Sequence, residues 1–337
     1  MKIKSWLSGM FVFGAILVAS ATTFANQAQD EAINYLKQAT LNTSKAENLT
    51  YDINFVMNTP VAEGVATFQG KYSSPRLLSG DMNLAFNAWI VNMNYKMNAK
   101  YYSEVDNGGT YSHYFKFEAT PPVENQGKWY VNKAALSEET LKMYAQERQK
   151  SAETVDKNIK NIFMYDVDKN TSKIYVTYHK PLVDNDVFKL ASEYEDNVSE
   201  DGVVSLNKDK NFQAVLAKPR DIGYEITIDK KANTIKEVNM DVSKLAQEVI
   251  SEYLATIPDE KFNTSEGFNM KSVIKNYLAR SKFTIDIKIS DINKTTLDKV
   301  PQDVLANATD ANELNKDTDK SEIAGSGTSG VSADVIK

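Results

Sequence analysis

The chain of 337 residues contains no cysteine. This absence excludes disulfide bonds, a thiolate metal site, a cysteine nucleophile and an acylated N-terminal cysteine. Only two histidines occur, His113 and His179, so a three-histidine zinc site is excluded, and the HExxH pattern is also absent. The sequence has neither a Gly-rich phosphate loop nor a G-x-S-x-G turn. We therefore expect a protein that is not an enzyme and that uses no cofactor or metal.

Basic charge and long apolar runs are also scarce. The formal net charge of -6 argues against non-specific nucleic-acid binding, which needs a concentrated basic surface. One apolar run, Trp6–Ala21, follows two lysines near the N-terminus and precedes small residues that end at Ala21 and at Ala25. This pattern is typical of a cleaved signal peptide; an uncleaved anchor is the alternative, but the run is shorter than the ~20 residues of a spanning helix. We expect residues 1–25 to be a signal peptide, cleaved after Ala21 or Ala25, and the mature protein to be periplasmic or extracellular, with no transmembrane segment.

The chain is rich in segments where apolar and polar residues alternate. The clearest is Gly80–Tyr102, where the apolar residues occupy even positions up to Phe86 and odd positions from Val91 onward. Because side chains of a strand alternate between its two faces, each half of this segment has one apolar face. A strand changes phase only at a turn or bulge, so we expect a hairpin bend at residues 87–89.

The spacing of apolar residues also predicts the other strands and helices. Strands are expected at about 49–57, 63–72, 111–117, 127–131, 165–179 (a hairpin), 222–242 (a hairpin) and 283–289. Helical spacing of apolar residues predicts helices at 30–41, 138–163 (with Val155, Ile159 and Ile162 on one face), 186–192, 244–256 and 271–280. Residues 193–201 are an acidic loop, and residues 310–337 are a disordered tail. We expect one large domain over residues 26–309; a division into two lobes is the alternative.

One turn imitates a metal site. Asp166, Asp168 and Asn170 match the start of a calcium loop. The sixth position is Thr171 where glycine is needed, however, and the twelfth is Thr177 where a bidentate glutamate is needed. We expect a turn at this place and no metal site.

An antiparallel sheet with one apolar face must cover that face with helices, a second sheet or a ligand. The apolar face here is rich in Met, Tyr and Phe, and methionine repacks around irregular guests. We expect His113, which shares a face with Phe115, to be buried or to face a cavity, and His179 to be exposed. A closed, packed core is one outcome, and a cavity suited to acyl chains is the other. The candidate cavity residues are Phe55, Met57, Phe68, Met82, Phe86, Met93, Tyr95, Met97, His113, Phe115, Phe117, Trp129, Ile226 and Ile285.

An exported chain that opens with a helix and continues into long alternating strands resembles the LolA/LppX-like superfamily of bacterial envelope proteins, in particular a secreted LolA-like branch that often occurs as lipoproteins. Local matches are Gly80–Leu84, Gly127–Tyr130, Tyr224–Lys231 and Ile289–Lys294 followed by Val300-Pro301. The resemblance implies an α+β fold: an unclosed β-barrel, which is a large curved antiparallel sheet with helices covering or plugging its open side. Well-studied members carry lipoprotein acyl chains or other lipids between membranes, and they use no catalytic residues.

The sequence departs from this family in two ways. It has no lipobox cysteine, and long helical inserts are expected at residues 135–163 and 243–280. The first departure favours a soluble carrier or exported factor, and the second leaves open whether the inserts fill the cavity. The hypothesis is a non-catalytic envelope protein that binds a lipid or a lipoprotein acyl chain in a half-barrel cavity. The alternative is a structural or protein-interaction module with a filled core.

Overall fold

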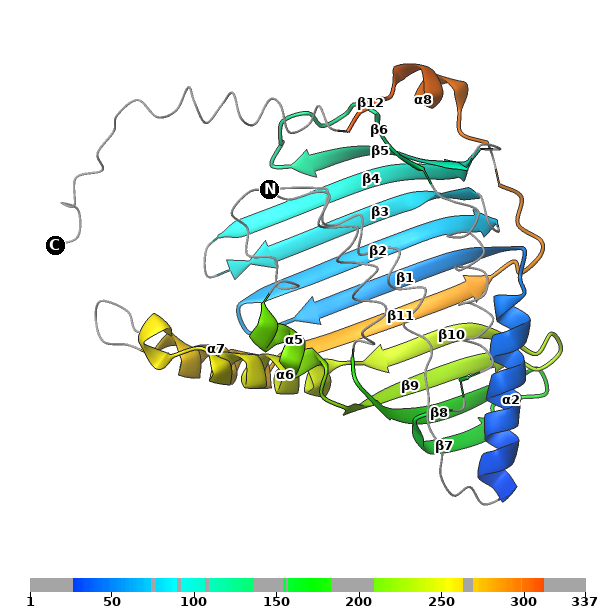
Figure 1. The fold of residues 1–337 in the computed structure, drawn as a ribbon, viewed down its shortest axis with the longest axis vertical. Coiled ribbons are helices and arrows are strands. Elements are labelled where there is room, and N and C mark those ends of the chain that lie inside the picture. The colour runs from blue at the N-terminus through cyan, green and yellow to red at the C-terminus, as the bar shows by residue number, and fades with distance from the viewer. Residues whose placement is uncertain are drawn as a thin grey trace.

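The computed structural model describes residues 27–73, 77–89, 92–106, 109–135, 154–155, 157–182, 209–262, 269–297 and 299–311. Its strands form one sheet of 12 strands in the order β12-β6-β5-β4-β3-β2-β1-β11-β10-β9-β8-β7 (Figure 1). The predicted signal peptide, the helix expected at 186–192 and the acidic loop lie outside the described residues.

Most of the predicted strands are confirmed. Neighbours in the sheet are antiparallel, except that β12 runs parallel to β6. The strands are β1 (Asn48–Asn58), β2 (Ala62–Ser73), β3 (Leu77–Ala88), β4 (Met93–Val105), β5 (Thr110–Thr120), β6 (Tyr130–Ala135), β7 (Ile159–Asp166), β8 (Thr171–Lys180), β9 (Arg220–Asp229), β10 (Thr234–Asp241), β11 (Lys282–Ser290) and β12 (Thr309–Asp310).

The helices expected at 30–41, 244–256 and 271–280 are also found. The described helices are α2 (Gln27–Ser44), α5 (Lys210–Leu216), α6 (Ser243–Thr256), the 3-10 helix η3 (Asp259–Phe262), α7 (Met270–Ala279) and α8 (Gln302–Asn307). No helix in the described part of the chain is both long and apolar enough to span a membrane. The folded structure extends by two residues into the segment that was expected to be a disordered tail. Asp310 belongs to β12, and Ala311 is buried.

The phase change in Gly80–Tyr102 is the hairpin that the sequence predicts. Phe86 of β3 pairs with Tyr95 of β4, and Leu84 pairs with Met97. Even positions of β3 therefore share a face with odd positions of β4, and the apolar set stays on one side of the sheet.

The helix expected at 138–163 is wrong at its C-terminal end, where β7 begins at Ile159. The register between β7 and β8 shifts between Ile159 and Asn161, as at a β-bulge. The extra residue puts Ile159 and Ile162 on the same face, three positions apart, and this spacing imitates a helix. Residues 138–153 of the expected helix lie outside the described residues.

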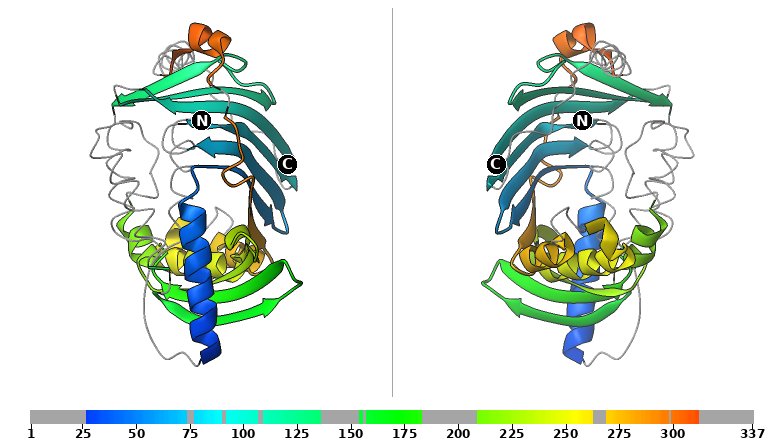
Figure 2. Two further views of the ribbon diagram at one scale, coloured as in Figure 1. Left: turned by 90° about the vertical axis from the view of Figure 1, so that its right-hand side faces the viewer. Right: turned by 90° about the vertical axis from the view of Figure 1, so that its left-hand side faces the viewer.

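The sheet is curved, and its first and last strands, β12 and β7, are not neighbours, so the barrel is open (Figure 2). Helix α2 crosses the strands of one half and contacts β10 and β7, while α6 contacts β11 and β9. Helix α8 lies at the other end of the sheet, beyond β5 and β6 (Figure 1). The fold is therefore the α+β unclosed barrel that the family resemblance implies, with its larger described helices gathered at the β7–β11 half.

Candidate apolar ligand site

The apolar sides of neighbouring strands join into one continuous face, which we call the inner face. The strand register carries it across the sheet, because residues directly opposite each other point to the same side. One row of paired residues runs Met240, Ile285, Phe55, Ala66, Leu84, Met97 and Ala119, from β10 to β5. The opposite, outer face carries the polar residues of the same strands.

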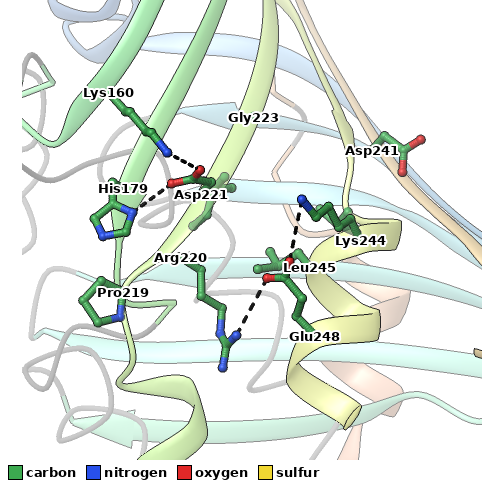
Figure 3. Close-up of a pocket in the computed structure, with 12 residues that line it drawn as sticks. Lys160, His179, Pro219, Arg220, Asp221, Gly223, Asp241, Lys244, Leu245 and Glu248 are labelled. Carbon is green, nitrogen blue, oxygen red and sulfur yellow. Dashed lines mark hydrogen bonds and ion pairs between the residues drawn. The ribbon is translucent and has the colours of Figure 1, made fainter. Parts of the chain in front are cut away.

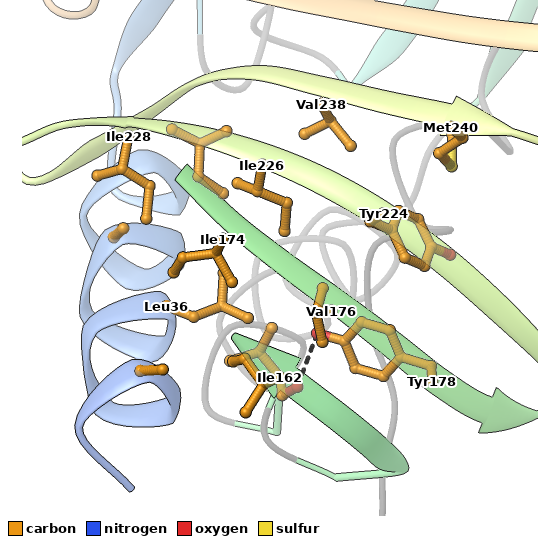
Figure 4. Packing of buried hydrophobic residues seen from close by; sticks show 14 of the residues in the cluster. Leu36, Ile162, Ile174, Val176, Tyr178, Tyr224, Ile226, Ile228, Val238 and Met240 are labelled. Atoms are coloured by element: carbon orange, nitrogen blue, oxygen red, sulfur yellow. Dashed lines mark hydrogen bonds between the residues drawn. The ribbon is translucent and has the colours of Figure 1, made fainter. Parts of the chain in front are cut away.

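The half of the inner face on β7–β11 is filled by protein. Helix α2 contributes Ala32, Leu36 and Ala39, which have 0–1% of their surface exposed and follow helical spacing along one stripe. Figure 4 shows Leu36 directed toward Ile174 and the strand side chains around it. A void of about 20 Å³ remains beside Leu36, which is too small for an acyl chain.

The half of the inner face on β1–β6 is buried less completely than the half on β7–β11. Its centre is an aromatic and methionine cluster in which Phe115 and Phe117 lie 5.7 and 6.4 Å from the ring of Tyr130. Toward β1 and β2 the inner-face side chains are only half-buried, and Met93 at the start of β4 is 45% exposed. No described helix makes contacts with the inner face of β1–β4 comparable to those of α2 and α6 elsewhere.

The candidate cavity residues divide accordingly. Met82, Met97, Phe115 and Phe117 are buried in the cluster on β3–β6, with His113 buried beside them. Phe55, Met57, Phe68, Phe86 and Tyr95 are half-buried on the inner face, and Met93 is exposed at its end. Ile226 and Ile285 belong to the filled half.

Trp129 differs from the expectation. Its ring lies 5.6 Å from that of Tyr102, on the outer face, in a cluster that includes Val304 of α8. The expected strand started at Gly127, but β6 starts at Tyr130 and turns Tyr130 toward the inner face. Because strand side chains alternate, the preceding tryptophan is then directed outward.

His113 is buried, as the sequence indicates. Its Nδ1 atom lies 2.5 Å from Ser103 Oγ, and the Tyr111 hydroxyl donates to the same oxygen at 3.1 Å. Burial lowers the pKa of His113 to about 4, so the imidazole is neutral at pH 7. Its Nε2 atom has no hydrogen-bond partner. The ring stacks with Phe115 at a centroid distance of 5.9 Å, so His113 is a polar point inside an apolar surface.

A bridge between two tyrosines crosses the inner face and was not foreseen. Gly70 of β2 and Gly80 of β3 are paired directly, and Tyr51 and Tyr101 are the next residues in the same row on either side. The two hydroxyl groups meet above the glycines in a hydrogen bond. Burial raises the pKa of Tyr101 to about 12 and that of Tyr51 further. The sequence shows a glycine in each of two neighbouring strands, Gly70 and Gly80. That the two glycines lie opposite each other, beneath the tyrosine bridge, follows only from the strand register.

A charged pocket of about 420 Å³ opens at the end of the sheet, next to the start of α6 (Figure 3). Asp221 Oδ2 accepts from Lys160 Nζ at 2.6 Å and Oδ1 lies 2.8 Å from His179 Nδ1, and these bonds lower the pKa of Asp221. Arg220 is 7% exposed and donates to Glu252 Oε1 at 2.9 Å. His179 is exposed, as expected. The pocket could not be found from the sequence, because its residues come from five elements.

The turn that imitates a calcium loop is the tip of the β7–β8 hairpin. Asp166 accepts from Ser172 Oγ at 2.8 Å and from Lys230 Nζ at 2.7 Å. Asp168 accepts from the backbone N–H of Asn170 at 2.6 Å, as a turn residue does. Within the described ranges no group of three or more His, Asp or Glu residues is arranged to hold a metal ion.

Comparisons with known proteins find only low similarity in sequence and in structure. No family model matches the chain, and no curated protein matches it in sequence. Among solved structures, LprF from Mycobacterium bovis is 11% identical with a TM-score of 0.35, and the match covers 81% of this chain and 97% of that one. A β-barrel-like protein of domain of unknown function DUF1849 from Brucella abortus is 8% identical with a TM-score of 0.22, over 57% of this chain and 85% of that one. The assignment of the fold rests on the sheet itself.

Proposed function

We propose that this protein is an exported, non-catalytic envelope protein that binds an apolar ligand, a lipid or a lipoprotein acyl chain, along the inner face of β1–β4. The observation that carries the proposal is the unequal cover of the inner face. Side chains of α2 fill the β7–β11 half, whereas Phe55, Phe68 and Phe86 in the other half keep part of their surface exposed. A continuous, partly exposed apolar surface of this kind favours an apolar ligand.

The substitution that tests this proposal uses neighbouring residues on opposite faces. Met93 and Asn94 are both exposed and adjacent in β4, but Met93 continues the inner face and Asn94 the outer face. Titration of the delipidated protein with a fluorescent fatty acid should saturate. Met93→Glu should weaken binding about tenfold, because it places a charge on the apolar surface, and Asn94→Glu should leave binding unchanged. Absence of saturable binding, or equal effects of the two variants, would refute the proposal.

A second candidate function, a protein-interaction module, is favoured by a separate surface. Phe163, Tyr165 and Tyr175 form a row on the outer face of β7 and β8, with ring centroids 6.0 Å apart at each step. Phe163 is 62% exposed, and β7 has one neighbour among the described strands. Exposed aromatic rows on edge strands are typical of protein contacts. Native mass spectrometry that finds a defined protein partner and no lipid, with the partner lost in Phe163→Ser, would support this function over lipid binding.

A further inference from the structure

We infer that the charged pocket beside α6 binds a small dipolar ligand, one that carries an ammonium group and an oxyanion. The pocket is separate from the inner-face surface of β1–β4, so this inference goes beyond the proposed function and does not depend on it. Its volume of about 420 Å³ falls in the ordinary range of small-molecule sites. The pocket has an apolar floor that includes Ile222, Val242 and Leu245.

Charges of both signs line the pocket, on two walls. The strand wall carries two cations, Lys160 and Arg220, and one carboxylate, Asp221, together with His179. The opposite wall carries two carboxylates, Asp241 at the end of β10 and Glu248 of α6, and one ammonium, Lys244 of α6. The neighbouring Glu252 pairs with both Lys218 at 2.7 Å and Arg220 at 2.9 Å. Lys160 and Arg220 outnumber Asp221 on the strand wall, and Asp241 and Glu248 outnumber Lys244 on the opposite wall, so the two walls carry opposite excess charge. This arrangement favours a dipole over a simple anion or cation.

Free hydrogen-bonding capacity is present on both walls. Lys244 is 89% exposed, and its ammonium lies 3.9 Å from the Glu248 carboxylate, beyond hydrogen-bond distance. On the buried side Arg220 lines the pocket and has an Nε atom with no partner, while its terminal nitrogens donate to Glu252 Oε1 and to the backbone oxygen of Val215. The carboxylate of Asp241 accepts from the backbone N–H of Ser243 at 3.0 Å through Oδ1. A ligand ammonium at Asp241 and a ligand oxyanion at Arg220 would give these groups further partners, and Lys160, which already donates to Asp221, would add positive charge beside the oxyanion.

Gly223 leaves the room for such a ligand. It lines the pocket, and a Cβ atom built on it would meet no heavy atom within 4 Å. Gly223→Leu therefore adds bulk at a lining position whose Cβ atom meets no clash, and it is the central test variant. Ala85→Leu, at an exposed position on the outer face of β3, is the matched control. Asp241→Asn is a second variant that keeps the oxygen acceptor for Ser243 and removes only the charge.

The experiment is calorimetric titration of the full chain with phosphoethanolamine and alanine as dipolar probes, and with inorganic phosphate and ethanolamine as single-charge probes. A short-chain phosphatidylethanolamine below its micelle concentration distinguishes a lipid headgroup from a free metabolite as the source. We expect at least one dipolar probe to bind about tenfold more tightly than either single-charge probe. Gly223→Leu should weaken that binding about tenfold, and Asp241→Asn should weaken it while leaving phosphate binding unchanged. Ala85→Leu should have no effect.

Three results would overturn the inference: no saturation by any dipolar probe up to about 10 mM, phosphate binding as tightly as the dipolar probes, or unchanged binding in Gly223→Leu and Asp241→Asn. Fatty-acid binding measured on the same Gly223→Leu protein keeps the two proposals apart. It should be unchanged, because Gly223 lies outside the inner-face surface of β1–β4. Loss of dipolar-probe binding with retained fatty-acid binding therefore supports the pocket without bearing on the lipid site.

Discussion

At the scale of single residues, the glycine pair under the tyrosine bridge carries a strong steric constraint. A Cβ atom on Gly80 would lie 2.2 Å from the backbone oxygen of Gln69 and 2.7 Å from the Tyr101 hydroxyl. Gly80→Ala should therefore lower the free energy of unfolding by about 3 kcal/mol, since backbone and bridge must both move. Gly223→Ala is the control, because its Cβ meets nothing, and it should change stability by less than about 1 kcal/mol. Urea unfolding measures both, and similar losses for the two variants would contradict the steric argument.

His113 gives the protein a pH-dependent stability. Burial disfavours the imidazolium, so the folded pKa of about 4 lies below the ordinary 6.5 of the unfolded chain. The contribution of His113 is thus fully present above pH 6.5 and is lost as the pH falls from 6.5 through 4, up to about 3 kcal/mol. His113→Phe should flatten the dependence of the unfolding free energy on pH over this window, as measured by urea unfolding at a series of pH values. An unchanged slope in His113→Phe would show that other groups cause it.

At the scale of elements, α2 is the helix that closes one half of the sheet. Leu36 is fully buried at the centre of its contact stripe, and Asn34 on the same helix is exposed. Leu36→Ala should cost about 2–4 kcal/mol of unfolding free energy, because the lost methyl groups leave a cavity next to an existing void. Asn34→Ala should change it by less than about 0.5 kcal/mol. A small effect of Leu36→Ala in thermal or urea unfolding would mean that α2 is not essential to this half.

Elements with an unbroken period could be predicted from the sequence, and irregular ones could not. β3, β4 and β9 show strict alternation, and their faces follow from it. The first part of β7, residues 159–163, has helical spacing in the sequence because one bulge residue changes the spacing of Ile159 and Ile162. Trp129 was assigned to the wrong face, because the register of β6 pairs its neighbour Tyr130 with Phe115 on the inner face and adjacent residues of a strand point to opposite faces. The charged pocket depends on tertiary placement of several elements, and no local pattern encodes that.

At the scale of the whole molecule, one sheet carries two cores of unequal packing. The core on β7–β11 surrounds Ile174, Ile228 and Val238, each with 0% exposure, whereas the inner-face residues of β1 are only half-buried. Local opening is easiest where few apolar contacts are buried. Backbone amides of β8–β10 should therefore exchange at least about tenfold more slowly than those of β1–β3, a difference of about 1.4 kcal/mol in opening free energy.

Hydrogen-exchange mass spectrometry of the ligand-free protein and of the protein saturated with fatty acid measures this difference directly. If the inner face of β1–β4 binds the acyl chain, the ligand should slow exchange in β1–β4 and leave β8–β10 unchanged, because the inner face is partly exposed on β1–β4 and buried on β8–β10. The Met93→Glu protein provides the control, since its exchange should respond little to the same ligand concentration. Uniform slowing in both halves would indicate global stabilisation from another site. Slowing confined to β8–β10 would place the ligand against α2, where a void of about 20 Å³ must first open.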